Sequence, residues 1–524
     1  MTDNANIVPM KYPVGVQSFE VMRQEGFVYV DKTDLIYQLA QKHICFLCRP
    51  RRFGKSLMLS TLEAYFSGKK ELFEGLKITS LEKEWKQYPV FHLDFNGANF
   101  QAPETLLNRL SDAVALWEKQ YAITPESKNL GDRFAYVLQQ AHKQTGLRCV
   151  VLVDEYDKPL LDVLGEPQEQ ANRETLKAFY SVFKLADANL RFVMLTGVTK
   201  FSQVSVFSGF NQPMDISMAP AYEAMCGITE EELDAVFASS IAELAAKNNR
   251  PAEGMKTLLK RRFDGYHFSQ NMTDIYNPFS LLNIFDTGII SDYWFASGTP
   301  TYLIKLLGRN KVDISAMLSR PYESSYFMDY RASTEDPLAM LYQSGYLTIK
   351  SVVQRGDDAN RYYLDFPNTE VKRGFITMLS NSYLTHNTDS KSIVERIVDC
   401  LEAHQLDEMR DLLDQYLSCV DYEMRKDKEY HFQYTLYLIF SLMSTYSVKV
   451  ERHNSQGWAD MIVETAERVY IFEFKLDGSA EAALQQIEEK EYAKPYLTDS
   501  RKVTKIGVAF SSQTGTIKEW MARE

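Results

Sequence analysis

Residues 49–56 read RPRRFGKS and lie between an apolar segment and a helical one. At such a junction, backbone N–H groups and a helix N-terminus can surround a phosphate group. Gly54 lets the backbone approach closely, Lys55 can reach the β- and γ-phosphates, and the Ser56 hydroxyl can ligate Mg²⁺. The usual pattern also begins with a glycine, and Arg49 stands in that place. This loop predicts binding of ATP with Mg²⁺. The expected nucleotide contacts are Arg52, Phe53, Gly54, Lys55 and Ser56.

Two adjacent acids, Asp154 and Glu155, follow the apolar segment 150–153. As partners of a phosphate-binding loop, Asp154 would hold the hydrated Mg²⁺ and Glu155 would polarise the attacking water. Taken alone, the pair is equally compatible with surface acids at an exposed strand end. Thr196 ends another apolar segment and is a candidate for sensing the γ-phosphate, although Thr-Gly turns after strands are common. The loop and the acids together favour nucleotide binding.

A second group of residues with catalytic chemistry occurs near the C-terminus, where Asp460 precedes the apolar stretch VYIFEFKLD. Alternate residues of a strand share one face, so Glu473 and Lys475 point the same way, while Phe472 and Phe474 point into a core. A surface ion pair is the simplest interpretation of this acid and lysine. Alternatively, Asp460 and Glu473 on neighbouring strands can hold Mg²⁺ or Mn²⁺ at a scissile phosphate. Lys475 would then orient water and stabilise charge in the transition state.

Other residues of reactive types are assigned to the core. Tyr266, His267 and residues 276–279 (YNPF) are expected to shape the interior of a helical region more than to touch a ligand. Cys45 and Cys48 have CxxC spacing, but no second cysteine or histidine pair lies nearby. Residues three apart on a strand also face opposite sides. We therefore interpret both cysteines as buried thiols.

Apolar segments alternate with helical ones along the first 200 residues, and this alternation predicts the fold class. The expected strands are residues 43–48, 88–95, 149–157 and 191–198. Strands that are apolar almost throughout, with helices between them, indicate a parallel sheet covered on both faces. Beyond about residue 220 the sequence changes character, and Thr229 with Glu232 is predicted to cap a helix.

The composition is that of a folded protein with more than one domain. The 524 residues are 45% hydrophobic and 24% charged, with a formal net charge of −12 and six cysteines. So few cysteines exclude a disulfide scaffold, and no apolar run reaches the roughly 18–20 residues that cross a bilayer. The first fifteen residues lack the features of a signal peptide, so the cytoplasm is the expected location. The acidic balance argues against a nucleic-acid coat without excluding a local basic face.

From about residue 10 to residue 350 the sequence resembles the AAA-ATPase-like family of bacterial and archaeal proteins. The resemblance is carried by YPVGVQSFEVM, YVDKT, RPRRFGKSLMLSTLEAYFSGKKELFEGL, VDEYDKPL, LTGVTKFS, SVFSGFNQ, FDGYHFS, YNPFSLL and YWFASGTPTYL. In that family the RPRRFGKS loop is usual, so Arg49 agrees with it. The resemblance implies a P-loop ATPase core followed by a helical lid. The positions that match the nucleotide motifs are Lys55, Ser56, Asp154 and Glu155.

The segment GWADMIVETAERVYIFEFKLDGSAEAALQQIEEKEYAKPY closely resembles the branch of the PD-(D/E)XK nuclease superfamily that follows AAA-ATPase-like domains. This resemblance covers about residues 420–515. The core motif falls on Asp460, Glu473 and Lys475. The helix glutamine of the family falls on Gln486, with Gln485 as the alternative. Glu429, on an upstream helix, is the candidate for an additional metal-binding acid.

We therefore predict an α/β protein with a P-loop NTPase parallel sheet and helical lid, plus a C-terminal α/β restriction-endonuclease-like domain. The expected divisions are an ATPase core (1–220), a helical lid or winged-helix-like region (221–350), a connecting region (351–420) and a nuclease-like domain (421–524).

The predicted function is ATP binding and hydrolysis coupled to metal-dependent cleavage of DNA, with RNA as the other substrate. The alternative is a nucleotide-gated switch or scaffold whose inactive nuclease-like domain binds nucleic acid or protein. A homo-oligomer is compatible with either hypothesis, since many P-loop ATPases complete their site with a neighbour's arginine. Arg51 and Arg52 can contact the nucleotide or a neighbouring subunit, or be solvated.

Overall fold

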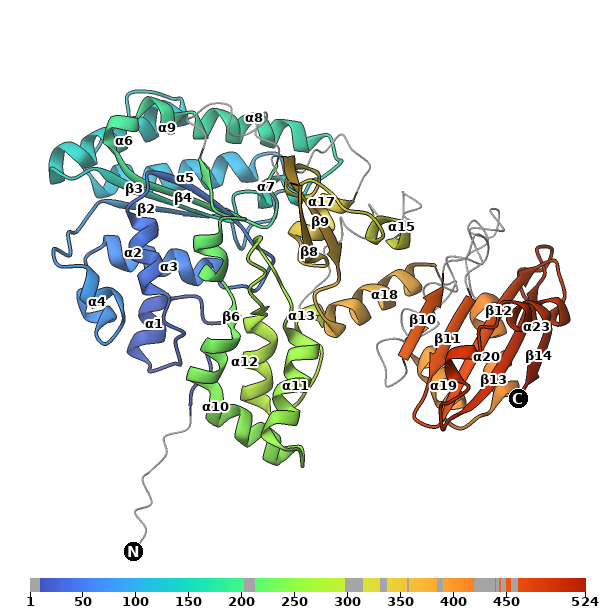
Figure 1. Cartoon of the computed structure of the whole chain (residues 1–524). Helices are drawn as coiled ribbons and strands as arrows, with labels where there is room; N and C mark the ends of the chain where they lie inside the picture. The colour runs from blue at the N-terminus through green and yellow to red at the C-terminus, as the bar shows by residue number, and fades with distance from the viewer. Residues whose placement is uncertain are drawn as a thin grey trace, which may run out of the picture. The chain divides into compact units, whose positions relative to one another are not determined.

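The computed structural model of the chain describes residues 10–201, 213–296, 314–329, 337–355, 358–383, 390–418, 439, 443, 449–453 and 460–524. The chain divides into two compact units (Figure 1). The first unit comprises residues 1–312 and 316–368, and the second comprises residues 313–315 and 369–524. None of the helices within the described ranges combines the length and apolar character that crossing a membrane requires.

A parallel sheet with the order β2-β3-β4-β1-β5 forms the centre of the first unit. Its strands are β1 (Ile44–Cys48), β2 (Val90–Asp94), β3 (Cys149–Asp154), β4 (Leu190–Gly197) and β5 (Met214–Asp215). Every residue of β1 and β3 is buried, as expected for strands covered on both faces. The four strands expected from the sequence are confirmed. Because the strands are parallel, the residues after their carboxyl ends meet at one edge of the sheet.

Helices cover both faces of this sheet, with α1 to α4 on one side and α5, α6, α8 and α9 on the other (Figure 1). Their bounds are α1 (Phe19–Gln24), α2 (Thr33–Ala40), α3 (Lys55–Phe66), α4 (Ile78–Leu81), α5 (Thr105–Gln120), α6 (Leu130–Thr145), α7 (Lys158–Leu161), α8 (Gln168–Tyr180) and α9 (Val182–Leu185). Short 3₁₀ helices are η1 (Lys70–Phe73), η2 (Asp187–Asn189), η3 (Pro220–Met225) and, in the second unit, η4 (Lys494–Tyr496).

A smaller helical subdomain follows the sheet in the first unit, and we call it the lid. Its elements are β6 (Ile228–Thr229), α10 (Glu230–Lys247), α11 (Ala252–Phe263), β7 (Ile275–Tyr276), α12 (Pro278–Thr287) and α13 (Tyr293–Ala296). Leu233, Phe237, Phe263 and Ile284 share its apolar core. The predicted capping box is confirmed, because Thr229 and Glu232 each accept a hydrogen bond from the other's backbone N–H.

The segment expected to connect the domains contributes to both units. In the first unit, the chain continues through α16 (Ser324–Met328) and α17 (Leu338–Gln343) into the hairpin of β8 (Thr348–Arg355) and β9 (Asp358–Asp365). The second unit includes the first two residues (314–315) of helix α15 (Ile314–Leu318). It continues with helices α18 (Thr369–Tyr383), α19 (Ser390–Glu402) and α20 (Leu406–Ser418).

The second unit contains a mixed sheet with the order β10-β11-β12-β13-β14. Its strands are β10 (Lys449–His453), β11 (Asp460–Glu464), β12 (Arg468–Leu476), β13 (Lys502–Phe510) and β14 (Ile517–Arg523). Strands β12 and β13 are parallel, and the other neighbours are antiparallel. Helix α23 (Ala480–Glu489) covers the face that carries Ile471, which packs with Leu484 and Ile487. On the opposite face, the Tyr470 hydroxyl donates to the Leu401 carbonyl of α19 at 2.6 Å.

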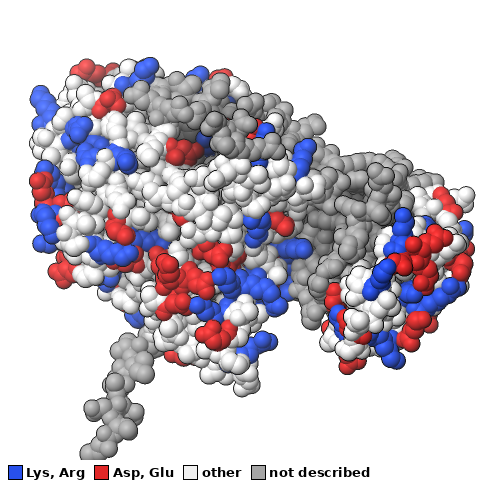
Figure 2. Space-filling view, in the orientation of Figure 1, with Lys and Arg blue, Asp and Glu red and all other residues white. Residues whose placement is uncertain are grey.

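Acidic and basic side chains are intermingled on the face of the molecule drawn in Figure 2, including the region at the start of α10. Such a mixed surface agrees with the modest net charge of −12 in 524 residues.

Gly507 on β13 is required for the close approach of α23, because a Cβ at this position would overlap the carbonyl oxygen of Ala480. We predict that Gly507→Ala lowers the free energy of unfolding of the second unit by about 2–3 kcal/mol through overpacking. Chemical denaturation followed by circular dichroism measures this change. Gly254→Ala in α11 is the matched control, since its Cβ would make only ordinary contact. Equal stability of Gly507→Ala and the wild type would contradict the requirement for glycine at this contact between β13 and α23.

Candidate functional sites at the strand ends

The loop after β1 brings Lys55 and Ser56 to the first turn of α3. Gly54 adopts a φ of 93°, and no heavy atom of a described residue lies within 4 Å of where its Cβ would be. The backbone is therefore open to a close-lying phosphate. The Lys55 ammonium is buried, and it donates to the carbonyl oxygens of Arg49 at 3.1 Å and Pro50 at 3.2 Å. Nothing in this geometry obstructs the predicted phosphate contacts.

A polar cavity of about 510 Å³ lies in front of this loop. Its charged lining residues are Arg51, Arg52, Lys55, Lys158 and Glu155. Lys158 already forms an ion pair with Asp162 at 2.7 Å, so Arg51, Arg52 and Lys55 supply the net positive charge opposite Glu155. This excess of positive charge makes the cavity suitable for an anionic ligand. The half-buried Ser56 hydroxyl also lines it, and the guanidinium of Arg52 is held 4.9 Å from the ring centre of Phe279.

An apolar cavity of about 100 Å³ adjoins the polar one. Residues that line both cavities are Pro13, Met22, Gly54, Leu57, Pro278 and Leu282. Phe53, a predicted nucleotide contact, lines the apolar cavity and packs against Tyr266, with ring centres 4.8 Å apart. The two cavities together join a cationic compartment to an apolar one, as the phosphates and base of a nucleotide require.

The acids after β3 lie beside the same loop. Asp154 is buried, and its Oδ1 accepts a hydrogen bond from the Thr196 hydroxyl at 2.7 Å. Thr196 therefore orients Asp154 and is not among the residues that line the polar cavity. Glu155 does line that cavity, and its Oε1 lies 3.9 Å from the Lys55 Nζ. The backbone of Glu155 has a φ of 53°, a conformation that is uncommon for residues other than glycine.

Arg49 faces the protein interior and not the cavity. Its guanidinium is almost completely buried, and it donates to the carbonyl oxygens of Cys48 and Ser217 at 3.0 and 2.7 Å. It also lies 4.1 Å from the ring centre of Phe268. Burial lowers the pKa of Arg49 from its ordinary value. Arg49, which replaces the first glycine of the usual phosphate-binding loop, thus attaches the loop after β1 to the segments that contain Ser217 and Phe268.

Asp157 fastens the turn after β3 to the turn after β4, a role that no sequence pattern indicated. Its Oδ2 accepts hydrogen bonds from the backbone N–H groups of Val198 at 3.0 Å and Thr199 at 2.6 Å. The side chain is fully buried, and burial followed by repulsion from Glu155 raises its pKa to about 7.

The second site is formed by β12 and α23. Glu473 is fully buried, and its Oε1 accepts a hydrogen bond from the Lys475 ammonium at 2.8 Å. Within the described part of the chain, its other oxygen has no hydrogen-bond partner. Lys475 also donates to the side-chain oxygen of Gln486. Gln485 instead bonds to Glu489 on the exposed side of the helix. The expected sharing of a face by Glu473 and Lys475 is confirmed.

The backbone places Asp460 in register with this pair. Met461 of β11 is opposite Phe472 of β12, so Asp460 and Glu473 are the next positions along the antiparallel ladder. Asp460 also begins β11 and pairs with His453 of β10. Glu429, the predicted additional acid, lies outside the described residues.

Several cavity-lining residues were missed or assigned elsewhere by the sequence analysis. No sequence motif distinguished three of the cavity-lining residues, Asn96, Lys158 and Asn283. Lys158 nevertheless lies shortly after Asp154, at the start of α7. Residues 278–279 were expected in the lid core, yet both line the polar cavity. His267 is buried as expected, with its ring nitrogens facing Ile349 O and Asp274 Oδ1.

The expected burial of Cys45 and Cys48 is confirmed, and both thiols are free. Burial raises the pKa of Cys45 to about 12 and holds the pKa of Cys48 well above its ordinary value. Burial of this kind disfavours the thiolate, which is the form of cysteine that binds metals or acts as a nucleophile.

Comparison with known proteins supports the assignment of both domains. Residues 13–207 match the family described as predicted AAA-ATPase, and residues 427–520 match the PD-(D/E)XK nuclease superfamily. A relative described as an uncharacterized protein in the vnfD 5′ region of Azotobacter chroococcum mcd 1 is 34% identical over 517 residues. That match covers 97% of this chain and 98% of the relative.

The fold and the two sites define a P-loop type α/β protein joined to a restriction-endonuclease-like domain. More particularly, the chain belongs to the AAA-ATPase-like family and carries a C-terminal domain of the PD-(D/E)XK nuclease superfamily. The predicted family and fold class are confirmed.

The buried carboxyl of Asp157 gives a pH-dependent contribution to stability. Its folded pKa of about 7 exceeds the unfolded value of about 3.9, so the folded state binds more protons between these limits. The free energy of unfolding contributed by this group therefore falls as the pH rises from about 4 to 7. We predict that, between pH 5 and pH 8, the free energy of unfolding of the wild type falls by on the order of 2–4 kcal/mol relative to that of Asp157→Asn.

Urea denaturation of both proteins at the two pH values measures this difference. Because all other titrating groups are present in both proteins, their contributions cancel when the two free energies are subtracted. Any constant effect of the substitution cancels as well. Asp112→Asn, on the exposed side of α5, is the control and should leave the pH dependence unchanged. Parallel stability curves for the wild type and Asp157→Asn would show that Asp157 is ionised throughout.

Proposed function

We propose that the chain binds and hydrolyses ATP and uses the nucleotide state to control a metal-dependent nuclease acting on DNA. The cationic lining of the polar cavity is the observation that carries the first half of the proposal. Lys55, Arg51, Arg52 and Lys158 face a space with Glu155 as its only lining carboxylate among the described residues. Several positive charges at a helix N-terminus favour triphosphate over a neutral or cationic ligand.

The adjoining apolar cavity supports a base beside the phosphates. Phe53, Met225 and Ile228 line it together with residues of the N-terminal segment and the lid. A base bound there would lie between the sheet and the lid, so the lid contributes to one wall of the site. This arrangement supports a dependence of lid position on the bound nucleotide.

The residues of the site divide the work of hydrolysis. Lys55 would exchange its two backbone carbonyl partners for phosphate oxygens, and Ser56 with Asp154 would hold Mg²⁺. When bound, Mg²⁺ neutralises charge on the transferred phosphoryl group. Asp154 is preorganised by the Thr196 hydroxyl. Glu155 accepts the proton of the attacking water, because it is the carboxylate that reaches the cavity.

The nuclease half of the proposal is supported by Glu473, whose second oxygen lies buried without a hydrogen-bond partner among the described residues. Such an oxygen is costly to desolvate, and a bound cation would satisfy it. Asp460 occupies the adjacent register position. These two residues would hold Mg²⁺ or Mn²⁺, which supplies Lewis-acid polarisation of the scissile phosphate.

Lys475 is positioned to act beside these acids. Its ammonium is fixed by Glu473 and Gln486, so its donors have a defined direction before substrate binds. Held in this way, Lys475 orients the attacking water and stabilises negative charge that develops on the phosphate. Gln486 positions Lys475 without itself reaching the reacting atoms.

Replacement of the ATP-site residues separates binding from turnover. We predict that Lys55→Ala weakens ATP binding at least tenfold, since it removes a buried cation that faces the phosphates. Glu155→Gln should retain binding and lose turnover by about 10²–10⁴-fold, as expected for loss of a general base. Calorimetric titration and phosphate release measure the two effects.

The control for charge loss is Lys143→Ala, an exposed lysine at the end of α6 outside the cavity. It should leave affinity and turnover unchanged. Unaltered ATP turnover in both Lys55→Ala and Glu155→Gln would remove the assignment of this site.

The nuclease site gives a second prediction. Cleavage of linear and circular DNA should require Mg²⁺ or Mn²⁺ and should vanish in Lys475→Ala and Glu473→Gln, because these side chains form an ion pair of a buried acid with a partly exposed lysine. Gln485→Ala is the matched control, since that side chain bonds to Glu489 on the exposed face of α23. Gel assays with and without ATP measure cleavage and its coupling to nucleotide.

Cleavage that survives in Lys475→Ala would point to a different site or a contaminant. Cleavage of RNA alone would correct the substrate class. A wild-type protein that binds Mn²⁺ and nucleic acid without cutting either would support the switch or scaffold alternative instead.

A further inference from the structure

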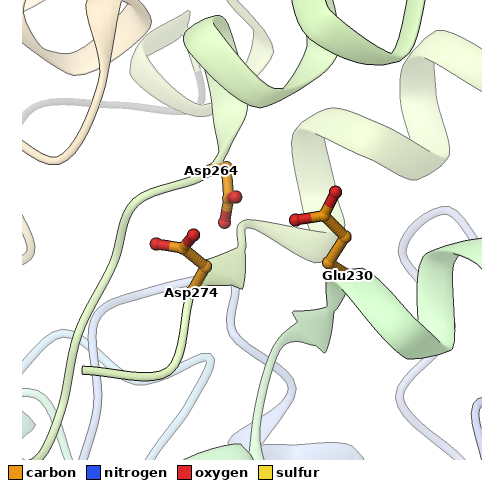
Figure 3. Close-up of side chains that lie close together, drawn as sticks. All are labelled: Glu230, Asp264 and Asp274. Carbon is orange, nitrogen blue, oxygen red and sulfur yellow. The ribbon is translucent and has the colours of Figure 1, made fainter. Parts of the chain in front are cut away.

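Three carboxylates converge in the lid, away from the loop after β1 (Figure 3). Glu230 is the first residue of α10, Asp264 follows the last residue of α11, and Asp274 precedes β7. One oxygen from each lies within 4.8 Å of the others. Figure 3 shows the three side chains pointing toward a common space. The set contains only oxygen donors.

Asp264 is the unusual member of this cluster. Its side chain is 2% exposed, and neither carboxylate oxygen has a hydrogen-bond partner among the described residues. Asp264 also lies at the C-terminal end of α11, where the helix dipole disfavours negative charge. A buried, ionised carboxylate with two unfilled oxygens is unfavourable unless a cation compensates it or a proton neutralises it.

The nearby cationic groups do not fill these oxygens. Lys260 bonds to Glu230 and lies 3.3 Å from Asp274, but its Nζ is 4.0 Å from the nearest Asp264 oxygen. His267 faces Asp274 at 2.8 Å. Lys350 donates to the carbonyl oxygens of Gly265 and Pro367. Lys256 Nζ also lies 3.2 Å from Glu230 Oε1. The ammonium groups of Lys256 and Lys260 therefore neutralise the outer two acids and leave the oxygens of Asp264 without a hydrogen bond among the described residues.

We propose that Glu230, Asp264 and Asp274 form a binding site for a hard divalent cation such as Ca²⁺ or Mn²⁺. Carboxylate oxygens without nitrogen or sulfur select this class of ion. Glu230 and Asp274 are about one-third exposed, which leaves access for the ion and for water ligands. Lys260, itself 44% exposed on a flexible chain, swings toward solvent when the ion binds.

The bound ion would fasten three lid segments that are separated along the sequence. Glu230 is only two residues from Ile228, which lines the apolar cavity. The ion would thereby stabilise one wall of that cavity without contacting a nucleotide. This inference does not depend on ATP hydrolysis or nuclease activity.

Calorimetric titration of the nucleotide-free full chain with CaCl₂ and with MnCl₂ tests the site. The wild type should bind one more equivalent of the cation than Asp264→Asn. Binding of this additional cation should raise the melting temperature of the wild type, and the variant should show no such increase. Lys260→Met, which keeps the apolar stem and removes the competing ammonium, should bind the same ion at least tenfold more tightly. Glu473→Gln is the comparison that removes the proposed nuclease-site ligand and leaves the lid cluster intact.

Equal cation stoichiometry in the wild type and Asp264→Asn would overturn the proposal. Binding confined to Lys260→Met would overturn it too, because Lys260 would then be the resident cation of the cluster. If Asp264→Asn does not fold, Asp274→Asn takes its place in the stoichiometric comparison. Loss of an equivalent in Glu473→Gln alone would assign the ion to the C-terminal site and count against the lid.

Discussion

A charged group can lie away from water only if neighbouring polar atoms replace the water that it lost, and both sheet-edge sites depend on this constraint. Lys55 is buried against two backbone carbonyls and faces Glu155. Lys475 is held by Glu473 and Gln486. In each site, an ammonium group is already fixed where phosphate oxygens would arrive. Substrate binding would then exchange its partners without ordering a mobile side chain.

The edge of the parallel sheet is itself fixed by buried polar groups. Asp157 joins the turns that follow β3 and β4, and Arg49 joins the loop after β1 to Ser217. Each uses a side chain to satisfy backbone groups that no strand or helix can satisfy at this edge. The loop after β1 and the turns after β3 and β4 are therefore connected by residues that do not line the cavity. Replacing Arg49 by the glycine of the usual loop would remove one of these connections.

Local signals in the sequence predicted much of this arrangement. The apolar strands, the cap formed by Thr229 and Glu232, and the shared face of Glu473 and Lys475 follow from short-range periodicity and were confirmed. The sequence left open which of two neighbouring glutamines of α23 faces the site. In the structure Gln486 faces Lys475, and Gln485 bonds to Glu489 on the exposed side of the helix.

Features that depend on contacts between distant segments could not be predicted in this way. The lid wall of the cavity requires Phe279 to meet Arg52, and the lid cluster requires Asp264 to meet Glu230. Neither pair is close in sequence, and no local pattern distinguishes these residues from ordinary core or surface positions. The inward direction of Arg49 likewise depends on Ser217 and Phe268 from other segments.

The buried carboxylates of the two units differ in how far protein groups satisfy their oxygens. Oδ1 of Asp154 accepts a hydrogen bond from the Thr196 hydroxyl, and its Oδ2 takes no part in that bond. Oδ2 of Asp157 accepts hydrogen bonds from two backbone N–H groups, whereas its buried Oδ1 has no partner among the described residues, and the pKa raised to about 7 favours a proton on this group. Glu473 has one unfilled oxygen and Asp264 has two, among the residues that the structure describes. A purely structural ion pair gives no reason to bury an oxygen in this state, since apolar residues of similar volume are often as stable. At Glu473 and Asp264 the unfilled oxygens lie where further carboxylates converge or occupy the adjacent register position, and a bound cation would satisfy them. This combination supports the two proposed metal sites.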